Sequence, residues 1–266
     1  MSKWQTLTLI ERGTGVAQVT MARPAVFNAF NEVMIAEIQA VFAELMADPK
    51  VRIIVLAGEG KHFSAGADLQ WMRRASEASQ EWNLEDARRL AQMLHTIESC
   101  PKPTIARING AALGGGVGLV CACDIAIAAD NATFTLSEAK FGIVPAVISP
   151  YVINAVGRRQ AKRLALTTTR IGAHEALELG LVHQVVSSEA LDKTVDMVIA
   201  DVLLGSPNAH QEIKWLFNQL SPSEITPEVR ELTAQTISRV RGTEEAREGF
   251  AAFLAKRPAS WLNQSE

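Results

Sequence analysis

The sequence predicts an α/β protein in which a largely parallel sheet is followed by a helical region. Residues 53–57 are entirely apolar, which is typical of a strand covered on both faces. Further strands are expected near Thr104, Ile125 and Leu181, separated by helical patterns, and this alternation favours parallel pairing with right-handed crossovers. Beyond about residue 200 the pattern is helical and too extended to close its own core. We therefore expect a core over residues 1–200 and a helical region for subunit packing over residues 201–266.

Each predicted element depends on a local pattern. Asn31 is expected to cap a helix that runs to about Asp48, since apolar residues recur there at helical spacing. Residues 70–83 are polar and irregular, so we expect a mobile, lid-like segment. Strands are expected over residues 5–10, 16–21, 53–57, 125–129, 133–136 and 181–186, the first two as a hairpin. The other helices are expected over residues 84–99, 159–166, 173–179, 189–204, 207–220, 227–241 and 243–255.

Composition excludes several classes of protein. With 48% hydrophobic and 21% charged residues the chain is ordinary for a soluble globular protein. A formal charge of −3 provides no basic field for nucleic acid or an anionic membrane. The uncharged run over residues 110–123 is shorter than the ~18 apolar residues of a membrane helix, and the first residues lack a signal-peptide pattern. The three cysteines (Cys100, Cys121 and Cys123) form no CxxC pair, so we expect a reducing, cytoplasmic location.

The most unusual stretch, residues 105–124, carries four glycines at positions 114, 115, 116 and 118, just before and within a predicted buried helix. Glycine inside a helix costs about 0.5–1 kcal/mol relative to alanine, and such conflicts with local propensity tend to mark functional sites. The first N–H groups of a helix lack intrahelical partners and carry the positive end of its dipole. We therefore predict an anion or oxyanion site. Close packing on the preceding strand would explain only one or two of the four glycines.

A second glycine-bearing loop, residues 60–69, follows the buried strand over residues 53–57. Ligands of open parallel sheets gather at the carboxyl ends of strands, where both loops are expected to lie. Each loop could then direct one N–H group at a shared oxygen.

Rival motifs are weak. The dinucleotide fingerprint G-x-G-x-x-G fails from Gly114, which meets Leu119 at its last place, and from Gly116, which meets Cys121. Neither a phosphate-binding G-x-x-x-x-G-K-[ST] loop nor a G-x-S-x-G elbow occurs. We expect no metal site because the histidines lack ligand spacing, and His62, beside the suspected site, is expected in a solvated loop. The histidines are His62, His95, His174, His183 and His210.

A carboxylate candidate, Glu138, follows the strand expected over residues 133–136. On the residues alone, a first-turn glutamate beside a capping Ser137 explains it more simply, since helix N-termini favour acids. A catalytic role is the alternative interpretation.

Five segments resemble the enoyl-CoA hydratase/isomerase (crotonase) superfamily. They occur in family order and span residues 5 to about 258, and the run over residues 138–151 is most similar to the bacterial methylglutaconyl-CoA and carboxygeranoyl-CoA hydratase branch. The segments are residues 23–30 (RPAVFNAF), 63–69 (FSAGADL), 109–116 (NGAALGGG), 138–145 (EAKFGIVP) and 253–257 (FLAKR).

The resemblance implies a spiral of ββα turns with C-terminal helices that form a homotrimer or a dimer of trimers. It implies that the N–H groups of Ala67 and Gly115 bind the thioester oxygen of an acyl-CoA substrate. No tightly bound cofactor is implied, since coenzyme A is part of the substrate. Lys256 would approach the CoA phosphates, across a subunit interface if need be. The remaining substrate- or CoA-binding residues implied are Ala25, Val26, Ala65, Asp68, Leu69, Gln70 and Gly114.

Within this resemblance Glu138 matches the residue that exchanges a proton with the substrate carbon skeleton, whereas Gly118 stands where two-glutamate hydratases have a second glutamate. We expect glycine to open volume there, where a substrate carboxylate could help to order water. The implied reaction is hydration of a branched or carboxylated 2-enoyl-CoA from leucine or isoprenoid breakdown. Single-glutamate isomerisation is the alternative enzyme, and a non-catalytic acyl-CoA- or RNA-binding protein is the other class; net charge disfavours RNA. Trp71, Met72 and Trp82 are candidate pocket walls, although apolar packing explains them equally well.

Overall fold

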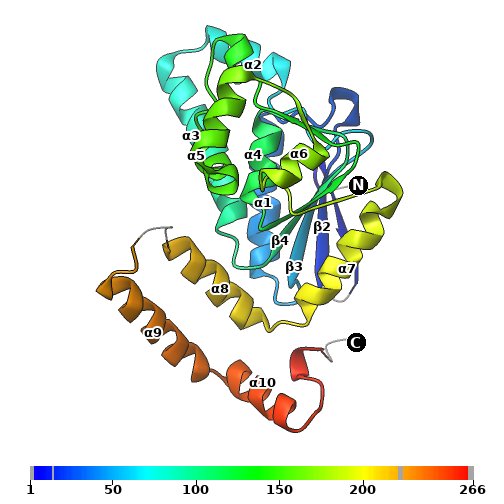
Figure 1. The fold of residues 1–266 in the computed structure, drawn as a ribbon. Coiled ribbons are helices and arrows are strands. Elements are labelled where there is room, and N and C mark those ends of the chain that lie inside the picture. The colour runs from blue at the N-terminus through cyan, green and yellow to red at the C-terminus, as the bar shows by residue number, and fades with distance from the viewer. Residues whose placement is uncertain (1–2, 14, 221–223, 263–266) are drawn as a thin grey trace.

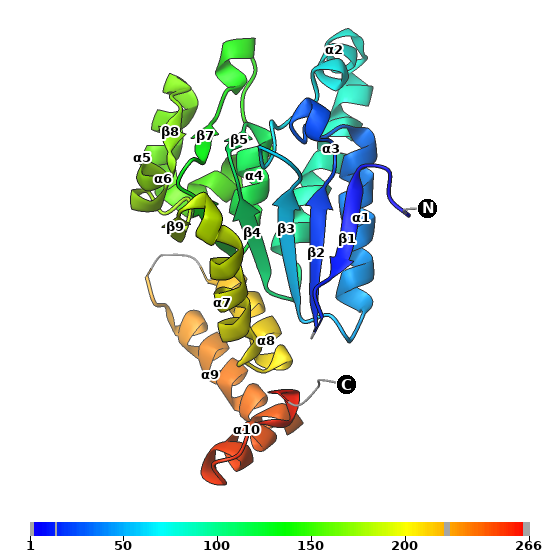
Figure 2. The same ribbon diagram turned by 90° about the vertical axis from the view of Figure 1, so that its right-hand side faces the viewer.

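The main sheet has six strands in the order β1-β2-β3-β4-β6-β9 (Figures 1 and 2). The computed structural model describes residues 3–13, 15–220 and 224–262. β1 pairs antiparallel with β2, and the other neighbouring strands pair in parallel, which confirms both the hairpin and the parallel pairing predicted for the later strands. These strands are β1 (Leu7–Glu11), β2 (Val16–Met21), β3 (Ile53–Gly58), β4 (Thr104–Ile108), β6 (Ile125–Ala129) and β9 (Gln184–Val186).

A second, three-stranded sheet lies beyond the carboxyl ends of β3 and β4 (Figure 2). β5 pairs in parallel with β7, which pairs antiparallel with β8. β5 was not predicted, because three residues next to a glycine run carry no period-2 pattern. The strands are β5 (Ala111–Leu113), β7 (Thr133–Thr135) and β8 (Ile171–Gly172).

Helices cover both faces of the main sheet. The even-numbered β3 residues Ile54 and Leu56 join the large core that includes α1, α3 and α4. Ile53 and Val55 face the opposite way and pack in a second cluster with residues of α7. The expectation of a strand covered on both faces is thus confirmed for β3. The helices are α1 (Glu32–Ala47), α2 (Leu69–Glu77), α3 (Gln80–Glu98), α4 (Gly115–Ala122), α5 (Ser149–Thr167), α6 (Ala173–Glu178), α7 (Leu191–Leu203), α8 (Pro207–Gln219), α9 (Pro227–Arg241) and α10 (Glu244–Leu254).

Residues 70–83, expected to be irregular, form most of α2 and the start of α3, with a break at Ala78 and Ser79. The expectation of irregular structure was therefore wrong. Asp68 caps α2 by accepting hydrogen bonds from the N–H groups of Gln70, at 2.8 Å, and Trp71, at 3.3 Å. Ser79 caps α3 in the same way through the N–H of Trp82. Side-chain acceptors at an N-cap satisfy donors that the helix cannot satisfy itself, and here they stabilise a polar sequence as helix.

The last three helices extend away from the sheet, at the end opposite the carboxyl ends of β2, β3 and β4 (Figures 1 and 2). Arg52, just before β3, ties this region to the core: its guanidinium donates to the carbonyl oxygens of Leu203, Gly205 and Trp261 at 2.7 to 3.0 Å. Among the described residues, no helix has both the length and the apolar character needed to cross a membrane.

Candidate active site

The two glycine-bearing loops meet at the carboxyl ends of β3 and β4. The N–H of Ser64 donates to the carbonyl of Ala111 at 3.1 Å, and the N–H of Leu113 donates back to the carbonyl of Ser64 at 2.9 Å. Gly66 has φ +80, and a Cβ there would lie 2.4 Å from the Leu113 oxygen and 3.1 Å from the nitrogen of Gly115. Only glycine therefore permits this approach of the two backbones.

The approach brings together two backbone donors, the N–H groups of Ala67 and Gly115. Phe30 fastens the chain on both sides of Ala67, since its N–H donates to Gly66 at 2.8 Å and its carbonyl accepts from Asp68 at 3.0 Å. Gly115 is the first residue of α4, where an N–H has no intrahelical acceptor. Neither N–H donates to an acceptor in the described part of the chain, and both residues line one cavity.

Close packing accounts for more of the glycine cluster than the sequence predicted. A Cβ on Gly115 would lie 2.3 Å from Cζ of Phe30, and one on Gly116 would lie 2.5 Å from the carbonyl oxygen of Ser64. These contacts exclude any side chain, because real Cβ atoms do not come so close. Close packing alone therefore requires glycine at positions 115 and 116, and it does not exclude the predicted oxyanion site, since Gly115 still lines the cavity.

Gly118 corrects a second expectation, that glycine opens volume at the position of the missing acid. A Cβ on Gly118 would lie 2.4 Å from Cγ2 of Ile148 and 2.9 Å from its Cβ. The side chain of Ile148 thus fills the space beside Gly118, and it leaves no room there for ordered water.

His62 also differs from the solvated loop residue that was expected. Its Nδ1 accepts a hydrogen bond from the N–H of Ala111 at 3.1 Å, and its carbonyl oxygen accepts from the side chain of Asn28 at 2.8 Å. The ring is half-buried and lies edge-on to Phe27. His62 therefore holds the glycine loop to β5 and has a structural role.

Glu138 begins a short 3-10 helix, Glu138–Phe141, that follows β7. Ser137 makes no side-chain capping bond, but Glu138 does lie in the first turn, so the simpler interpretation is confirmed for the position of Glu138 and wrong for the cap. The carboxyl group lines the same cavity as Ala67 and Gly115, and its Oε2 is buried without a hydrogen-bond partner in the described residues. Burial raises the pKa of Glu138, and the backbone N–H groups of Glu138 and Ser137 oppose the rise only in part.

The cavity has a volume of about 310 Å³ and an apolar wall. Trp71 and Met72 are part of that wall, as expected, whereas Trp82 packs partly buried against the core. One further acid, Asp86 of α3, lines the cavity and was not predicted. The lining residues are Phe30, Ala67, Trp71, Met72, Ala75, Asp86, Ala87, Leu90, Gly115, Glu138, Ile143, Val144, Pro145, Ala146, Val147 and Ile148.

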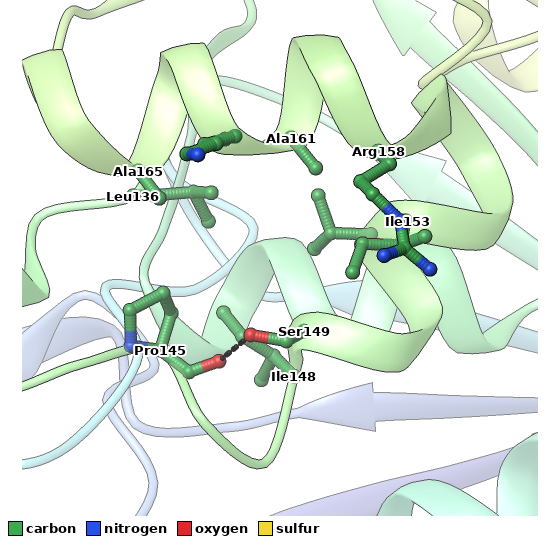
Figure 3. Close-up of a pocket in the computed structure, with 10 residues that line it drawn as sticks. Leu136, Pro145, Ile148, Ser149, Ile153, Arg158, Ala161 and Ala165 are labelled. Atoms are coloured by element: carbon green, nitrogen blue, oxygen red, sulfur yellow. Dashed lines mark hydrogen bonds between the residues drawn. The ribbon is translucent and has the colours of Figure 1, made fainter.

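A second cavity, of about 230 Å³, lies beyond Pro145 and Ile148 (Figure 3). These two residues line both cavities, and the hydroxyl of Ser149 donates to the carbonyl of Pro145 at 2.6 Å and so fixes the wall between them. The second cavity is lined by apolar side chains of α5 together with Arg158 and Lys162. Ile148 therefore lies, with Pro145, between the two cavities.

The residues expected to bind CoA divide into two groups. Leu69, with 73% of its surface exposed, and Gln70 lie at the start of α2, beside the loop of Ala65. Ala25 and Val26 form an exposed 3-10 turn, Pro24–Val26, joined to this loop because Arg23 pairs with Asp68 at 2.9 Å. The carboxylate of Asp68 is thus engaged by Arg23 and by the cap of α2.

Gly114 and Lys256 complete the expected set. Gly114 lies between β5 and α4 with φ +49, and a Cβ there would lie 3.0 Å from Oε1 of Glu138. Lys256 follows α10, and α10 lies at the end of the molecule opposite α2 (Figures 1 and 2). Trp71 and Met72 of α2 line the cavity. Within one chain, Lys256 is therefore not brought to the site.

Comparison with known proteins agrees with this geometry. Residues 11–264 match the model of the enoyl-CoA hydratase/isomerase family. The chain belongs to this family. The expected crotonase fold is confirmed: an enoyl-CoA hydratase structure from Shewanella pealeana has a TM-score of 0.94 at 41% identity, over 97% of each chain.

Family members with different activities resemble the chain to a similar degree. Crotonyl-CoA hydratase of Syntrophomonas wolfei is 32% identical over 260 residues, which cover 96% of this chain and 98% of the relative. A trans-2-decenoyl-acyl-carrier-protein isomerase of Streptococcus mutans is 31% identical over 248 residues, which cover 91% and 93%. Membership of the family therefore indicates chemistry on an enoyl thioester. It does not by itself decide between hydration and isomerisation.

Proposed function

We propose that this protein catalyses the reversible addition of water to the C2=C3 bond of an enoyl-CoA. The observation that carries the proposal is the pair of unbonded N–H groups, on Ala67 and Gly115, in one cavity with the carboxyl group of Glu138. Adding water at C3 of an enoyl thioester places negative charge on the thioester oxygen. Fixed backbone donors stabilise such charge, and a single donor of this kind can be worth about 2.7–4 kcal/mol.

Glu138 is assigned as the acid–base residue that exchanges a proton with C2. Burial raises its pKa, which keeps the protonated form accessible nearer neutral pH than for a solvated glutamate. The unpartnered Oε2 leaves the carboxyl group free to take or give a proton.

The cavity favours an apolar acyl chain, straight or branched, over a carboxylated one. Its lining includes no Lys, Arg or His, and its two ionisable side chains, Glu138 and Asp86, are both acids. A substrate carboxylate buried among apolar groups and these two acids costs far more than a methyl branch. Arg158 and Lys162 lie in the cavity behind Ile148 and do not line this one. The resemblance implied a branched or a carboxylated 2-enoyl-CoA as substrate. Of these two, we therefore propose the branched one.

The test is the variant Glu138→Gln assayed with straight, branched and carboxylated enoyl-CoAs. We expect hydration kcat to fall by roughly 10²–10⁴-fold, the usual contribution of a positioned proton donor. Glu77→Gln, on an exposed glutamate of α2, is the matched control and should leave kcat unchanged. Undiminished hydration by Glu138→Gln would remove Glu138 from the mechanism.

Double-bond isomerisation is the second candidate, favoured by the absence of an acid at Gly118 and by the similarity to an isomerase. A single carboxylate can shuttle a proton between two carbons. Turnover in ¹⁸O-labelled water separates the two reactions, because isomerisation forms no labelled hydroxyacyl product. Tight acyl-CoA binding without either reaction would indicate a binding protein.

We also propose that the chain assembles as a trimer or a dimer of trimers in which Lys256 reaches the CoA phosphates of a neighbouring subunit. Support comes from the position of α10, which precedes Lys256 and lies at the opposite end of the molecule from α2 (Figures 1 and 2), and from exposed apolar side chains on the C-terminal helices. Phe253 and Leu254 of α10 are each 81% exposed in the single chain. Burying such side chains between subunits is favourable by about 25 cal/mol per Å².

A further inference from the structure

Asp86 occupies a position on α3 where the helix otherwise presents apolar side chains. Leu90, Met93, Leu94 and Ile97 follow it at spacings of four, seven, eight and eleven residues, which is the core-facing stripe of a helix. An acid at the start of such a stripe is unusual, because isolated buried carboxylates are costly. This spacing was the sequence signal that could have revealed Asp86.

The carboxyl group of Asp86 is only partly satisfied by the protein. Its side chain is 9% exposed, and Oδ1 accepts a hydrogen bond from Nε1 of Trp71 at 3.2 Å. The nearest cation, Arg89, is half exposed and stands 3.9 Å from the same oxygen. Oδ2 has no hydrogen-bond partner among the residues that the structure describes, and Asp86 lines the cavity that holds Glu138 and Gly115.

Trp71 places Asp86 relative to the oxyanion donors. Its ring lies 6.1 Å from that of Phe30, centroid to centroid, and Phe30 is the ring on which Gly115 packs. The hydrogen bond from Trp71 therefore connects Asp86, through two packed rings, to the loop that carries one donor N–H. An exposed surface aspartate would have no such fixed relation to the site.

We propose that Asp86 is the second carboxyl group of the active site, the group that accepts a proton from the attacking water. This inference rests on the proposed hydration. The position that two-glutamate hydratases use is closed, because Ile148 fills the space beside Gly118, whereas Asp86 approaches the same cavity from α3. Glu138 and Asp86 are the acids that line the cavity, so the water proton has one carboxylate available besides Glu138.

The step balances with these two residues. The water oxygen bonds to C3 while one of its protons passes to Oδ2 of Asp86, and the C2=C3 π electrons move onto the thioester oxygen as an enolate. The enolate is held by the N–H groups of Ala67 and Gly115 and collapses as C2 takes the proton of Glu138. Solvent then returns the proton from Asp86 to Glu138, which restores both groups. Burial raises the pKa of Asp86, against the opposing effects of Trp71 and Arg89, and a more basic carboxylate is a better acceptor for this proton.

The experiment compares Asp86→Asn with the wild type in two reactions. Hydration of crotonyl-CoA requires water activation, whereas exchange of the C2 protons of butyryl-CoA in D₂O, followed by NMR, requires only Glu138 and the oxyanion donors. Asn retains an Oδ1 acceptor for Trp71, so the fold should be preserved. We expect hydration kcat to fall by roughly 10²-fold or more with KM little changed, and exchange to stay within about 3-fold of wild type.

Trp71→Phe is the matched control, since it removes the Nε1 donor and keeps the carboxylate; it should lose less hydration activity than Asp86→Asn. Wild-type kcat in Asp86→Asn, or an equal loss of hydration and exchange, would overturn the proposal and leave Asp86 a structural residue. If the wild-type protein exchanges C2 protons but hydrates no enoyl-CoA, the proposed function is wrong. Asp86 would then have no attacking water to deprotonate.

Discussion

The burial of Glu138 makes the stability of the fold depend on pH. Burial raises its pKa, so the folded protein holds the Glu138 proton more tightly than the unfolded chain does. The contribution of this group to stability is therefore fully present below the unfolded pKa near 4.5 and is lost as pH rises through the raised pKa. Ionising this buried carboxyl group therefore costs stability, and the cost grows as the pH rises.

Glu138→Gln should consequently raise the melting temperature at pH 8 while it lowers the kcat of hydration. Gln has no charge to bury, so its advantage should shrink as the pH is lowered and disappear near pH 4. Thermal unfolding followed by circular dichroism at pH 4, 6 and 8 measures this difference. A constant advantage across that range would show that packing, rather than ionisation, separates the two proteins.

Gly118 and Ile148 form a contact that a single methyl group should break. Gly118→Ala would place a Cβ 2.4 Å from Ile148, and overpacking of this kind typically costs about 1–3 kcal/mol. Gly172→Ala, at a glycine with nothing within 4 Å, is the control and should change the free energy of unfolding less. Urea denaturation compares the two. Equal effects would mean that Ile148 yields easily.

Ile148 also separates the two cavities, and its truncation should change substrate choice. Ile148→Ala would join the cavities of about 310 and 230 Å³, so longer or bulkier acyl chains should gain in kcat/KM relative to crotonyl-CoA. The same change should cost about 2–5 kcal/mol of stability, as for other truncations of buried aliphatic residues. A chain-length series of enoyl-CoAs measures the shift, with Val152→Ala as a control that lines only the second cavity.

At the scale of elements, the parts that could be predicted from the sequence are those with a local cause. α1 was predicted with its cap because apolar residues recur at helical spacing after Asn31. In the structure the side chain of Asn31 accepts a hydrogen bond from the N–H of Met34, which confirms the cap. β3 was predicted because residues 53–57 are all apolar, and the structure buries every residue of the strand. α2 was missed because the cap that stabilises it, Asp68, is itself held by Arg23, which lies far away in the sequence.

The site shows the same division. The glycine loops and Glu138 are encoded in short motifs, and their roles could be assigned by resemblance. The filling of the space beside Gly118 by Ile148, and the entry of Asp86 from α3, arise only when distant segments pack together. Local sequence carries no record of those contacts, although the acid in the apolar stripe of α3 was a usable signal.

The double role of Asp68 can be separated experimentally. Asp68→Ala should remove both the cap of α2 and the ion pair with Arg23, at a cost of about 2 kcal/mol, whereas Asp68→Asn keeps an acceptor for the cap and should cost about half as much. Chemical denaturation at pH 7 measures both variants. If Asn were as damaging as Ala, the ion pair and not the cap would be the main stabilising contact.

At the scale of the whole molecule, the C-terminal helices contact the core mainly near its end opposite the site, through Arg52 and through Lys214, which pairs with Asp124 at 2.5 Å. The proposed assembly predicts that Phe253→Asp together with Leu254→Asp lowers the molar mass measured by light scattering toward that of one chain. The KM for the acyl-CoA should rise, because Lys256 would no longer reach the CoA phosphates of a neighbouring subunit. Ile10→Asp, on an exposed edge residue of β1, is the control and should keep the native mass.

The proposed oxyanion donors belong to the backbone, whereas the walls of the cavity are mostly side chains. A substitution replaces a side chain and leaves the N–H group in place, so we expect single substitutions in the cavity to alter which acyl chain is accepted more readily than they alter the proposed stabilisation of the enolate. Substitution of one wall residue at a time should therefore change the substrate specificity while the reaction stays the same. The same asymmetry recommends Ile148 and Met72, not the glycine loops, as starting points for directed evolution.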